Sequence, residues 1–350
     1  MEAACYLRAF RFYEPNIPWK LDEVPTPPVG PRDVLVKIKA SGICGTDLHY
    51  KHGRGSPGKM PIILGHEIAG IIEERGNEVK NASVGDAVCV HYIISCGDCV
   101  HCSQGNDNRC QNRKSIGHHL DGGFAEYISI PERNAFRLPD EVSFDQGAII
   151  GCAVSTGFHA LRVGEFQPGD SVAVFGLGGV GMHAVLWARV LGASKVIGVD
   201  VLDFKLRLAS ELGADFTVNA AEADPVEEIK SLTDGLGVDV SLEVAGTAKT
   251  MKQAILSVCE SGYASGRAVS VAMMFEPITV AGLRTLREGA LRKSGDHTRD
   301  ELRRVINLVR AKRIDLSKSV THRLPFEELN HGLDLLDEKK EDVLRVVVLQ

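Results

Sequence analysis

The chain has 350 residues, which is long enough for two domains with sizeable cores. Hydrophobic residues make up 44% of it and charged residues 25%, as in ordinary globular proteins, and the formal net charge is −6. An acidic chain without a basic stripe is not expected to bind nucleic acid. No apolar run approaches the ~20 residues that span a bilayer, so no membrane partner is expected either.

The spacing of the nine cysteines predicts the redox state of the compartment in which the protein works. Four of them fall within fifteen residues, a pattern typical of metal binding rather than of disulfides. The first residues lack the charged and apolar regions of a signal peptide and read as a strand. We therefore expect a reducing, cytoplasmic environment.

The pattern of the chain changes near residue 150. Before it, short strands alternate with turns, as at 34–39, 68–74 and 87–91. After it, apolar strands alternate with amphipathic helices, which predicts an α/β unit with a parallel sheet. The predicted strands are 171–175, 195–199, 215–218, 238–244 and 267–272; a helix is predicted over 299–312 and a last strand over 343–349, returning to the first domain.

A glycine-rich turn follows the first of these parallel strands. Its residues are Gly176, Leu177, Gly178, Gly179, Val180 and Gly181, and an apolar helix comes next. Glycines at these positions permit a tight turn, let the backbone approach a pyrophosphate and allow close helix–strand packing. The helix N-terminus favours the negative charge of phosphates. The turn therefore predicts a dinucleotide site.

An acidic residue ends the next strand. Asp200 lies 19 positions after Gly181, about the spacing expected of a carboxylate that accepts the ribose hydroxyls. A carboxylate there repels a 2′-phosphate, so NAD is predicted rather than NADP. The alternative is that Asp200 only terminates the strand.

Two groups of residues have the chemistry of metal ligands. Cys96, Cys99, Cys102 and Cys110 follow a spacing that predicts a closed four-thiolate Zn²⁺ site, although the first two alone could form a redox dithiol. Cys44, His66 and Cys152 are dispersed, and each alone could be a core residue. Together they would leave a fourth zinc position open, where the metal polarises a substrate oxygen.

These motifs together resemble the zinc-dependent medium-chain alcohol dehydrogenases. The resemblance covers essentially the whole chain and is carried by the segments 42–49, 65–67, 96–110, 151–157 and 176–181. It implies an α/β protein in which a GroES-like, mostly β catalytic domain (1–153 and 292–350) flanks a Rossmann NAD-binding domain (154–291). It also implies two Zn²⁺ per chain, with Cys44, His66 and Cys152 as the catalytic ligands; this set of ligands is a known family example.

The resemblance implies roles for further residues. Thr46 would accept the proton of the alcohol and pass it through the cofactor ribose to His49, and Glu67 would be a second, transient zinc ligand. Lys205 would contact the adenosine ribose, and Arg345 the pyrophosphate. Asp47 would orient ligands, and Tyr92 with Met273 or Met274 would line the substrate pocket. His49 and Arg345 could instead be surface residues, and the methionines core residues.

The expected reaction is reversible hydride transfer from a primary or secondary alcohol to NAD, which gives an aldehyde or ketone. Cys152 stands where polyol and butanediol enzymes of the family usually carry Glu, which favours the simpler alcohol dehydrogenases. The alternative is a polyol, diol or amino-alcohol dehydrogenase; a zincless reductase would lack the ligands. Shorter members of the family are usually tetramers, so a homotetramer is expected.

Overall fold

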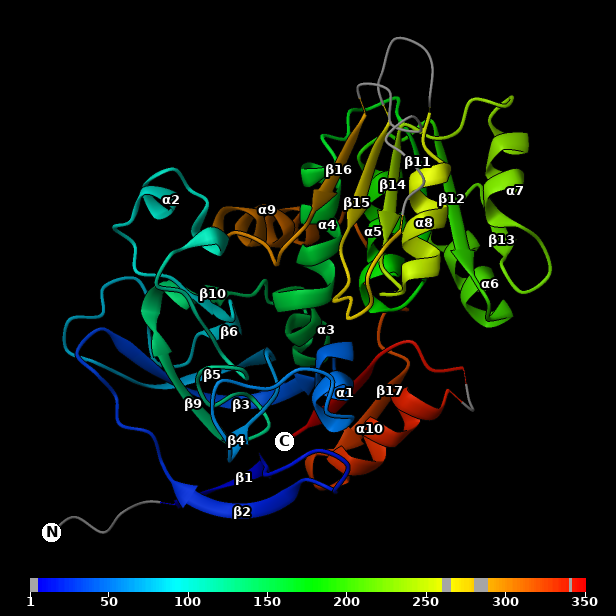
Figure 1. The fold of residues 1–350 in the computed structure, drawn as a ribbon. Helices are drawn as coiled ribbons and strands as arrows, with labels where there is room; N and C mark the ends of the chain where they lie inside the picture. Colours follow the sequence, from blue (N-terminus) through cyan, green and yellow to red (C-terminus); the bar gives the residue numbers. More distant parts are fainter. Residues whose placement is uncertain (1–5, 260–265, 280–288, 340–341) are drawn as a thin grey trace, which may run out of the picture. The chain divides into compact units, whose positions relative to one another are not determined.

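The computed structural model describes residues 6–259, 266–279, 289–339 and 342–350, and it divides into two compact units. Unit 1 comprises residues 1–152 and 297–350, and unit 2 comprises 153–296 (Figure 1). The first five residues of the strand predicted at the start of the chain lie outside the described part. Within the described part no helix is long and apolar enough to cross a membrane.

Unit 1 is built mainly from antiparallel strands. Its largest sheet has the order β10-β6-β5-β3-β18-β17, with β9 paired to β3, and a smaller sheet has the order β2-β1-β4. Its strands and helices are β1 (Tyr6–Phe12), β2 (Lys20–Pro25), β3 (Asp33–Gly42), α1 (Gly45–Lys51), β4 (Ile62–Ile63), β5 (Glu67–Arg75), β6 (Ala87–Val90), β7 (Ile93–Ile94), α2 (Val100–Ser103), β8 (Lys114–Ser115), β9 (Tyr127–Pro131), β10 (Ala135–Arg137), α3 (Phe144–Ile149), α9 (Arg299–Arg310), β17 (His322–Pro325), α10 (Leu329–Glu338) and β18 (Val346–Leu349).

The long strand β3 organises unit 1. Val34, Val36 and Ile38 are buried and the lysines between and after them are less so, as the alternating pattern predicts. It pairs with β5 and β9, and with the last strand β18 through Ala40–Gly42. The end of the chain therefore joins the sheet of its beginning, and β18 starts at Val346, three residues later than predicted.

Unit 2 is a six-stranded parallel sheet with helices. The strand order is β13-β12-β11-β14-β15-β16, which is that of a doubly wound dinucleotide-binding fold. Its elements are α4 (Ser155–Val163), β11 (Ser171–Phe175), α5 (Gly179–Val190), β12 (Lys195–Asp200), α6 (Asp203–Glu211), β13 (Phe216–Asn219), α7 (Pro225–Leu232), β14 (Val240–Glu243), α8 (Ala248–Leu256), β15 (Arg267–Ser270) and β16 (Ala290–Lys293). The predicted α/β fold with a parallel sheet is confirmed.

The sixth strand was not predicted. β16 reads Ala-Leu-Arg-Lys and lies at the edge of the sheet, where two apolar residues followed by two charged ones give no strand pattern. Its pairing with β15 places residues 292–296, which the sequence assigned to the other domain, within unit 2.

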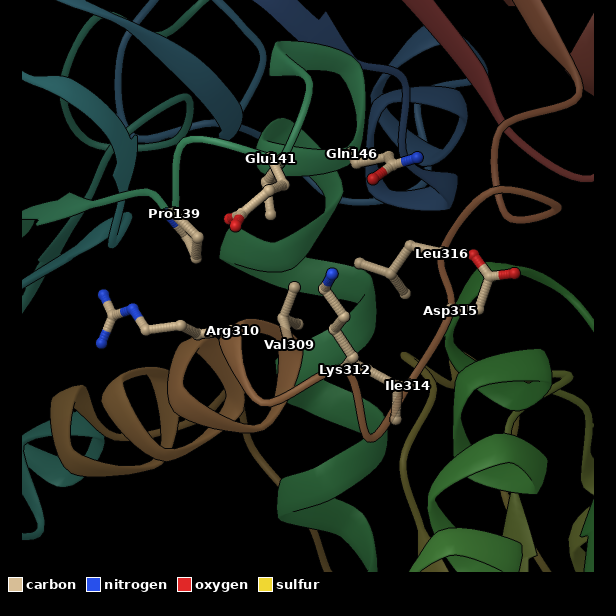
Figure 2. A pocket seen from close by; sticks show the side chains of 10 residues that line it. Pro139, Glu141, Gln146, Val309, Arg310, Lys312, Ile314, Asp315 and Leu316 are labelled. Atoms are coloured by element: carbon tan, nitrogen blue, oxygen red, sulfur yellow. The ribbon is translucent and has the colours of Figure 1, made fainter.

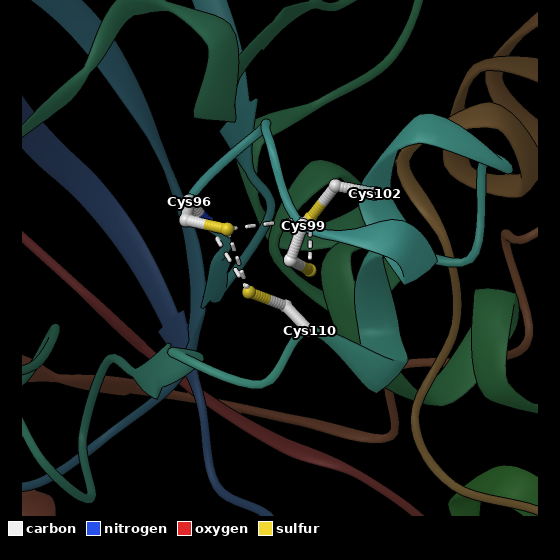
Figure 3. A group of neighbouring side chains, drawn as sticks. All are labelled: Cys96, Cys99, Cys102 and Cys110. Atoms are coloured by element: carbon white, nitrogen blue, oxygen red, sulfur yellow. Dashed lines mark hydrogen bonds between the residues drawn. The ribbon is translucent and has the colours of Figure 1, made fainter.

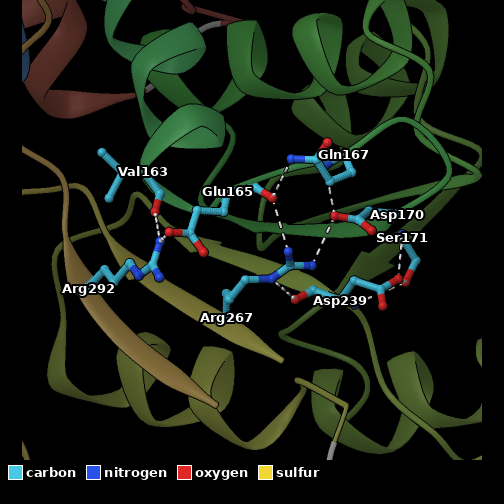
Figure 4. Close-up of polar contacts among 8 residues, drawn as sticks. All are labelled: Val163, Glu165, Gln167, Asp170, Ser171, Asp239, Arg267 and Arg292. Atoms are coloured by element: carbon cyan, nitrogen blue, oxygen red, sulfur yellow. Dashed lines mark hydrogen bonds and ion pairs between the residues drawn. The ribbon is translucent and has the colours of Figure 1, made fainter. Parts of the chain in front are cut away.

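Two arginines on neighbouring strands of the parallel sheet, Arg267 on β15 and Arg292 on β16, bond to the chain before β11 (Figure 4). Arg267 donates to the Glu165 carbonyl at 3.0 Å, to Asp170 Oδ2 at 2.9 Å and to the Asp239 carbonyl. Arg292 pairs with Glu165 Oε1 at 2.7 Å and donates to the Val163 carbonyl. These bonds tie β15 and β16 to the segment before β11.

Candidate metal and cofactor sites

The four cysteines of the 96–110 loop converge (Figure 3). Cys110 Sγ lies 3.4 Å from Cys96 Sγ, Cys99 Sγ lies 3.5 Å from Cys102 Sγ, and Cys96 Sγ lies 3.9 Å from Cys102 Sγ. A tetrahedral ion with Zn–S bonds of about 2.3 Å would set its sulfurs about 3.8 Å apart, so the cluster fits zinc.

Backbone N–H groups favour the thiolate form of Cys99, whereas burial raises the pKa of Cys102 to about 12. Hydrogen bonds from the backbone of Cys102 and Gln111 lower the pKa of Cys99 to about 6. The Cys96 N–H also donates to Cys110 Sγ at 3.2 Å. All four residues were found from spacing alone, because the loop that carries them is contiguous in sequence.

The second cluster combines residues from three distant segments of unit 1. Ligand atoms of Cys44, His66, Glu67 and Cys152 all lie within 4.8 Å of one another. Cys44 precedes α1, His66 and Glu67 stand at the start of β5, and Cys152 lies on a π-helical turn, Ile150–Val154. π-Helical turns are rare in proteins as a whole, but many of those that occur lie at functional sites.

The chemistry of this cluster suits a cation. The hydrogen bond with Cys152, together with the charges of His66 and Arg345, holds the pKa of the Cys44 thiol well below its usual range despite burial. Glu67 is fully buried, and its Oε1 has no hydrogen-bond partner among the described residues. Two thiols, an imidazole and an orphaned carboxylate oxygen form a donor set typical of catalytic zinc.

Asp47 hydrogen-bonds to the backbone of Cys44. Its Oδ2 accepts the Cys44 N–H at 2.8 Å, and the pair closes a capping box at the start of α1. Desolvation by burial raises the pKa of Asp47 to about 6. The geometry is that of a residue which orients Cys44.

The residues predicted for proton transfer lie on the same short helix. Thr46 Oγ1 is 3.8 Å from Cys44 Sγ, within hydrogen-bonding distance for sulfur. His49 is partly buried, and desolvation lowers its pKa. His52, one turn further, has its Nε2 2.7 Å from Asp337 Oδ2.

Arg345 has a partner that the sequence could not reveal. Its guanidinium pairs with Glu67 Oε2, 278 residues away in the chain, and both side chains are buried. Gly42 allows this pair, because a Cβ there would lie 2.2 Å from Glu67 Oε2. The predicted contact with a pyrophosphate stays a prediction.

Aromatic rings line one side of the cluster. Tyr92 is buried, and its ring centroid lies 5.1 Å from that of His66. It also packs edge-on against His297 at 5.6 Å, a residue that the sequence did not single out. Met273, in contrast, is 41% exposed, and Met274 packs against the core of unit 2.

The glycine-rich turn has the geometry expected of a phosphate cradle. Gly176 has φ +94°, and a Cβ on Gly181 would lie 1.9 Å from the Gly176 carbonyl, so both positions need glycine. At Gly178 a Cβ would meet nothing within 4 Å, which leaves its backbone open to a ligand. Gly179 and Val180 begin α5, whose N-terminal N–H groups lie at this opening.

Asp200 and Lys205 lie next to that turn. Asp200 Oδ2 accepts the Leu177 N–H at 2.7 Å, and Oδ1 accepts the N–H groups of Val201 and Leu202. Lys205 Nζ is 3.8 Å from Asp200 Oδ2. The acid at the end of β12 is therefore fixed against the backbone of the glycine-rich turn.

A cavity of about 130 Å³ lies elsewhere in unit 1 (Figure 2). It is formed by residues before and on α3 and by the end of α9, with Val142, Val309 and Leu316 among its apolar lining. None of the predicted site residues lines it, so it has no part in the chemistry described above.

Family models match both units of the chain. The alcohol dehydrogenase GroES-like domain matches residues 30–140, and the zinc-binding dehydrogenase domain matches 179–311. An L-threonine 3-dehydrogenase of Symbiobacterium thermophilum is 34% identical over 341 residues, 94% of each chain. An alcohol dehydrogenase of Geobacillus stearothermophilus is 35% identical over 320 residues, 91% of this chain and 92% of that one.

A solved structure is similar along its whole length. It is a zinc-binding dehydrogenase from Sinorhizobium meliloti 1021 bound to NADP, with a TM-score of 0.90, 32% identity, and coverage of 99% of this chain and 100% of that one. The chain belongs to the zinc-dependent medium-chain alcohol dehydrogenase family. It is an oxidoreductase that acts on CH–OH groups, of the alcohol and polyol dehydrogenase type.

Proposed function

We propose that the protein is an NAD-dependent zinc alcohol dehydrogenase, which oxidises a primary or secondary alcohol to an aldehyde or ketone and runs in reverse. The observation that carries this proposal is the buried cluster of Cys44, His66, Glu67 and Cys152, with ligand atoms within 4.8 Å of one another. In this proposal Cys44, His66 and Cys152 hold the catalytic zinc, and Cys96, Cys99, Cys102 and Cys110 hold the structural zinc.

Zinc held by Cys44, His66 and Cys152 would supply Lewis-acid polarisation of the substrate oxygen. The residues of the chain supply the rest. Thr46, two positions after Cys44, accepts the hydroxyl proton, and His49 passes it towards solvent. Desolvation lowers the pKa of His49, which favours the neutral imidazole over the charged form. Glu67 offers its orphaned oxygen as a transient ligand.

Unit 2 would bind the nicotinamide cofactor that accepts the hydride. Gly176, Gly178, Gly179, Val180 and Gly181 form the proposed pyrophosphate site. Asp200 and Lys205 form the proposed ribose site, and the Asp200 carboxylate disfavours the 2′-phosphate of NADP. In unit 1, Arg345 adds the proposed pyrophosphate contact.

A second candidate is an amino-alcohol, polyol or diol dehydrogenase. It is favoured by the similarity to an enzyme named L-threonine 3-dehydrogenase, which is as great as the similarity to one named alcohol dehydrogenase. In this chain both candidates would use the cluster of Cys44, His66, Glu67 and Cys152 and the same cofactor site, and the choice between them depends on the side chains that contact the rest of the substrate.

A substrate panel tests the proposal and separates its two forms. Purified zinc-loaded protein is given NAD with simple primary, secondary and cyclic alcohols, and in parallel with sorbitol, butane-2,3-diol and threonine, while NADH absorbance is followed. Turnover of simple alcohols at higher kcat/KM supports the first form, and preference for threonine or a polyol supports the second. No turnover in either group contradicts both.

We also propose a homotetramer in a reducing, cytoplasmic compartment. The eight cysteines in the described part of the chain form no disulfide, which agrees with a reducing environment. Light scattering during size-exclusion chromatography tests the assembly: four chains per particle agree with the proposal, and a monomer or dimer contradicts it.

A further inference from the structure

Lys293 is a cation at the carboxyl end of the parallel sheet in unit 2. It is the last residue of β16 and stands opposite Ser270, the last residue of β15 (Figure 1). Its Nζ donates to the carbonyls of Ala272 at 2.7 Å and Val271 at 3.1 Å, which follow β15. An ammonium has three N–H groups, so these two bonds fix its position without using its full capacity.

A buried carboxylate lies in the same layer. Glu243 ends β14, and its Oε1 accepts the N–H groups of Ala245 and Gly246 and the Thr250 hydroxyl. Burial lowers the pKa of Lys293, and the negative charges of Glu243 and Asp296 oppose that shift. The ammonium is thus held by two backbone carbonyls, while the negative charges of Glu243 and Asp296 favour its charged form; the side chain remains exposed.

The strand order of the parallel sheet indicates which half of a bound dinucleotide would lie near Lys293. In a sheet of this order the cofactor crosses the carboxyl edge where the order reverses, between β11 and β14. Asp200, at the end of β12, marks the half that would receive the adenosine ribose. The nicotinamide must then lie over the other half, at the ends of β14, β15 and β16, where Lys293 is the residue that ends the outermost strand.

Resting on the proposed NAD site, we propose that Lys293 sets the relative affinity of the protein for the two redox states of its cofactor. The nicotinamide ring carries a positive charge in NAD⁺ and none in NADH, whereas the ribose and pyrophosphate groups are the same in both. A fixed ammonium near the ring therefore repels the oxidised form selectively. Lys293 favours NADH, and the exposure of its side chain keeps the effect modest.

The test compares dissociation constants for NAD⁺ and NADH, measured by fluorescence titration of the full zinc-loaded chain without substrate. Lys293→Met removes the charge and Lys293→Arg keeps it. Lys252→Met is the matched control, because Lys252 is exposed on α8 of the same unit. The ratio Kd(NAD⁺)/Kd(NADH) is taken within each variant, so that a partial loss of folded protein cancels.

Lys293→Met should lower this ratio by about three- to tenfold, and less at high salt, while the other two variants keep the wild-type ratio. If both dinucleotides bind and Lys293→Met leaves the ratio unchanged, the inference is overturned. An equal change in Lys293→Arg also overturns it, because packing rather than charge would then be the cause. If the wild-type chain binds neither dinucleotide, it is the proposed function that fails.

Discussion

The Leu177 N–H donates to Asp200 Oδ2 at 2.7 Å, so the acid that ends β12 is bonded directly to the glycine-rich turn after β11. The bond fixes the carboxylate beside the proposed ribose site, with Lys205 Nζ 3.8 Å away. Position and charge together make Asp200 the residue expected to distinguish NAD from NADP.

Asp200→Gly should therefore reduce the preference for NAD. Loss of the carboxylate removes both the acceptor for the ribose hydroxyls and the repulsion of a 2′-phosphate, and Lys205 is left to attract the phosphate. We expect kcat/KM for NAD to fall and that for NADP to rise, a change of at least tenfold in their ratio. Steady-state kinetics with both cofactors check this; equal use of the two by the wild type, or an unchanged ratio in the variant, would contradict it.

The two cysteine clusters should respond differently to the same substitution. Cys99→Ser removes a thiolate from a closed site that staples a loop, so one zinc should be lost and the melting temperature lowered. Cys152→Ser alters the cluster proposed for catalysis, so turnover should fall by several orders of magnitude while NADH still binds. Metal analysis, melting curves and NADH titration of both variants provide the check. Matching stability losses and matching residual activities would refute this division of roles.

The proton path predicts unequal effects along α1. Thr46→Val removes the hydroxyl 3.8 Å from Cys44 Sγ and should reduce alcohol oxidation by roughly 10²–10⁴-fold. His49→Gln should slow it only modestly and mainly at low pH, because water can replace the outer group. Added imidazole should restore part of that loss.

The pH profiles of kcat for Thr46→Val, His49→Gln and wild type test whether the proton passes through these two residues. Wild-type turnover in Thr46→Val would exclude its role. An unchanged profile in His49→Gln would move the relay elsewhere, and His52 is the next residue to test. Its Nε2 lies 2.7 Å from Asp337 Oδ2, so His52→Gln would remove that pairing as well.

The buried His183 of α5 should make unit 2 sensitive to acid. Burial lowers its pKa to about 4, against a usual value of 6.5, while Nδ1 donates to the Gly179 carbonyl at 2.6 Å. Because the folded pKa is depressed, the unfolded chain binds the proton first. The stability contributed by neutral His183 is complete above about pH 6.5 and is lost as the pH falls towards 4. The loss in unfolding free energy is at most about 3 kcal/mol.

Urea unfolding of unit 2, followed at several pH values, measures this loss. His183→Asn keeps a donor for the Gly179 carbonyl and should flatten the fall in unfolding free energy between pH 6.5 and 4. The matched control is His331→Asn, on an exposed position of α10, which should follow the wild-type curve. If His183→Asn also follows the wild-type curve, proton uptake by His183 is not the cause of the acid sensitivity.

The parts of this molecule that local patterns encode could be predicted from the sequence. The four cysteines of one loop have a ligand spacing, and the turn from Gly176 to Gly181 has a backbone requirement that only glycine meets. The alternating apolar pattern of β3 and the capping box Thr298–Glu301 before α9 are local in the same way. Fold class followed from these patterns and from the alternation of strands and helices.

Features that depend on distant contacts could not be predicted. The ion pair of Arg345 with Glu67 joins residues 278 positions apart, and nothing near either residue indicates the other. The π-helical turn that presents Cys152 has no reliable sequence pattern. β16 forms because its edge position tolerates Arg292 and Lys293, and the bonds of Lys293 to the turn after β15 appear only once that strand is paired.

Direct hydride transfer from a CH–OH carbon to nicotinamide is the central claim, and isotope transfer tests it most directly. The best alcohol from the substrate panel, deuterated at its carbinol carbon, is oxidised in ordinary water with NAD, and the reduced cofactor is examined by mass spectrometry and NMR. We predict that one deuterium appears on the nicotinamide ring for each carbonyl product formed. Reduced cofactor without deuterium, or carbonyl product without reduced cofactor, would contradict the account.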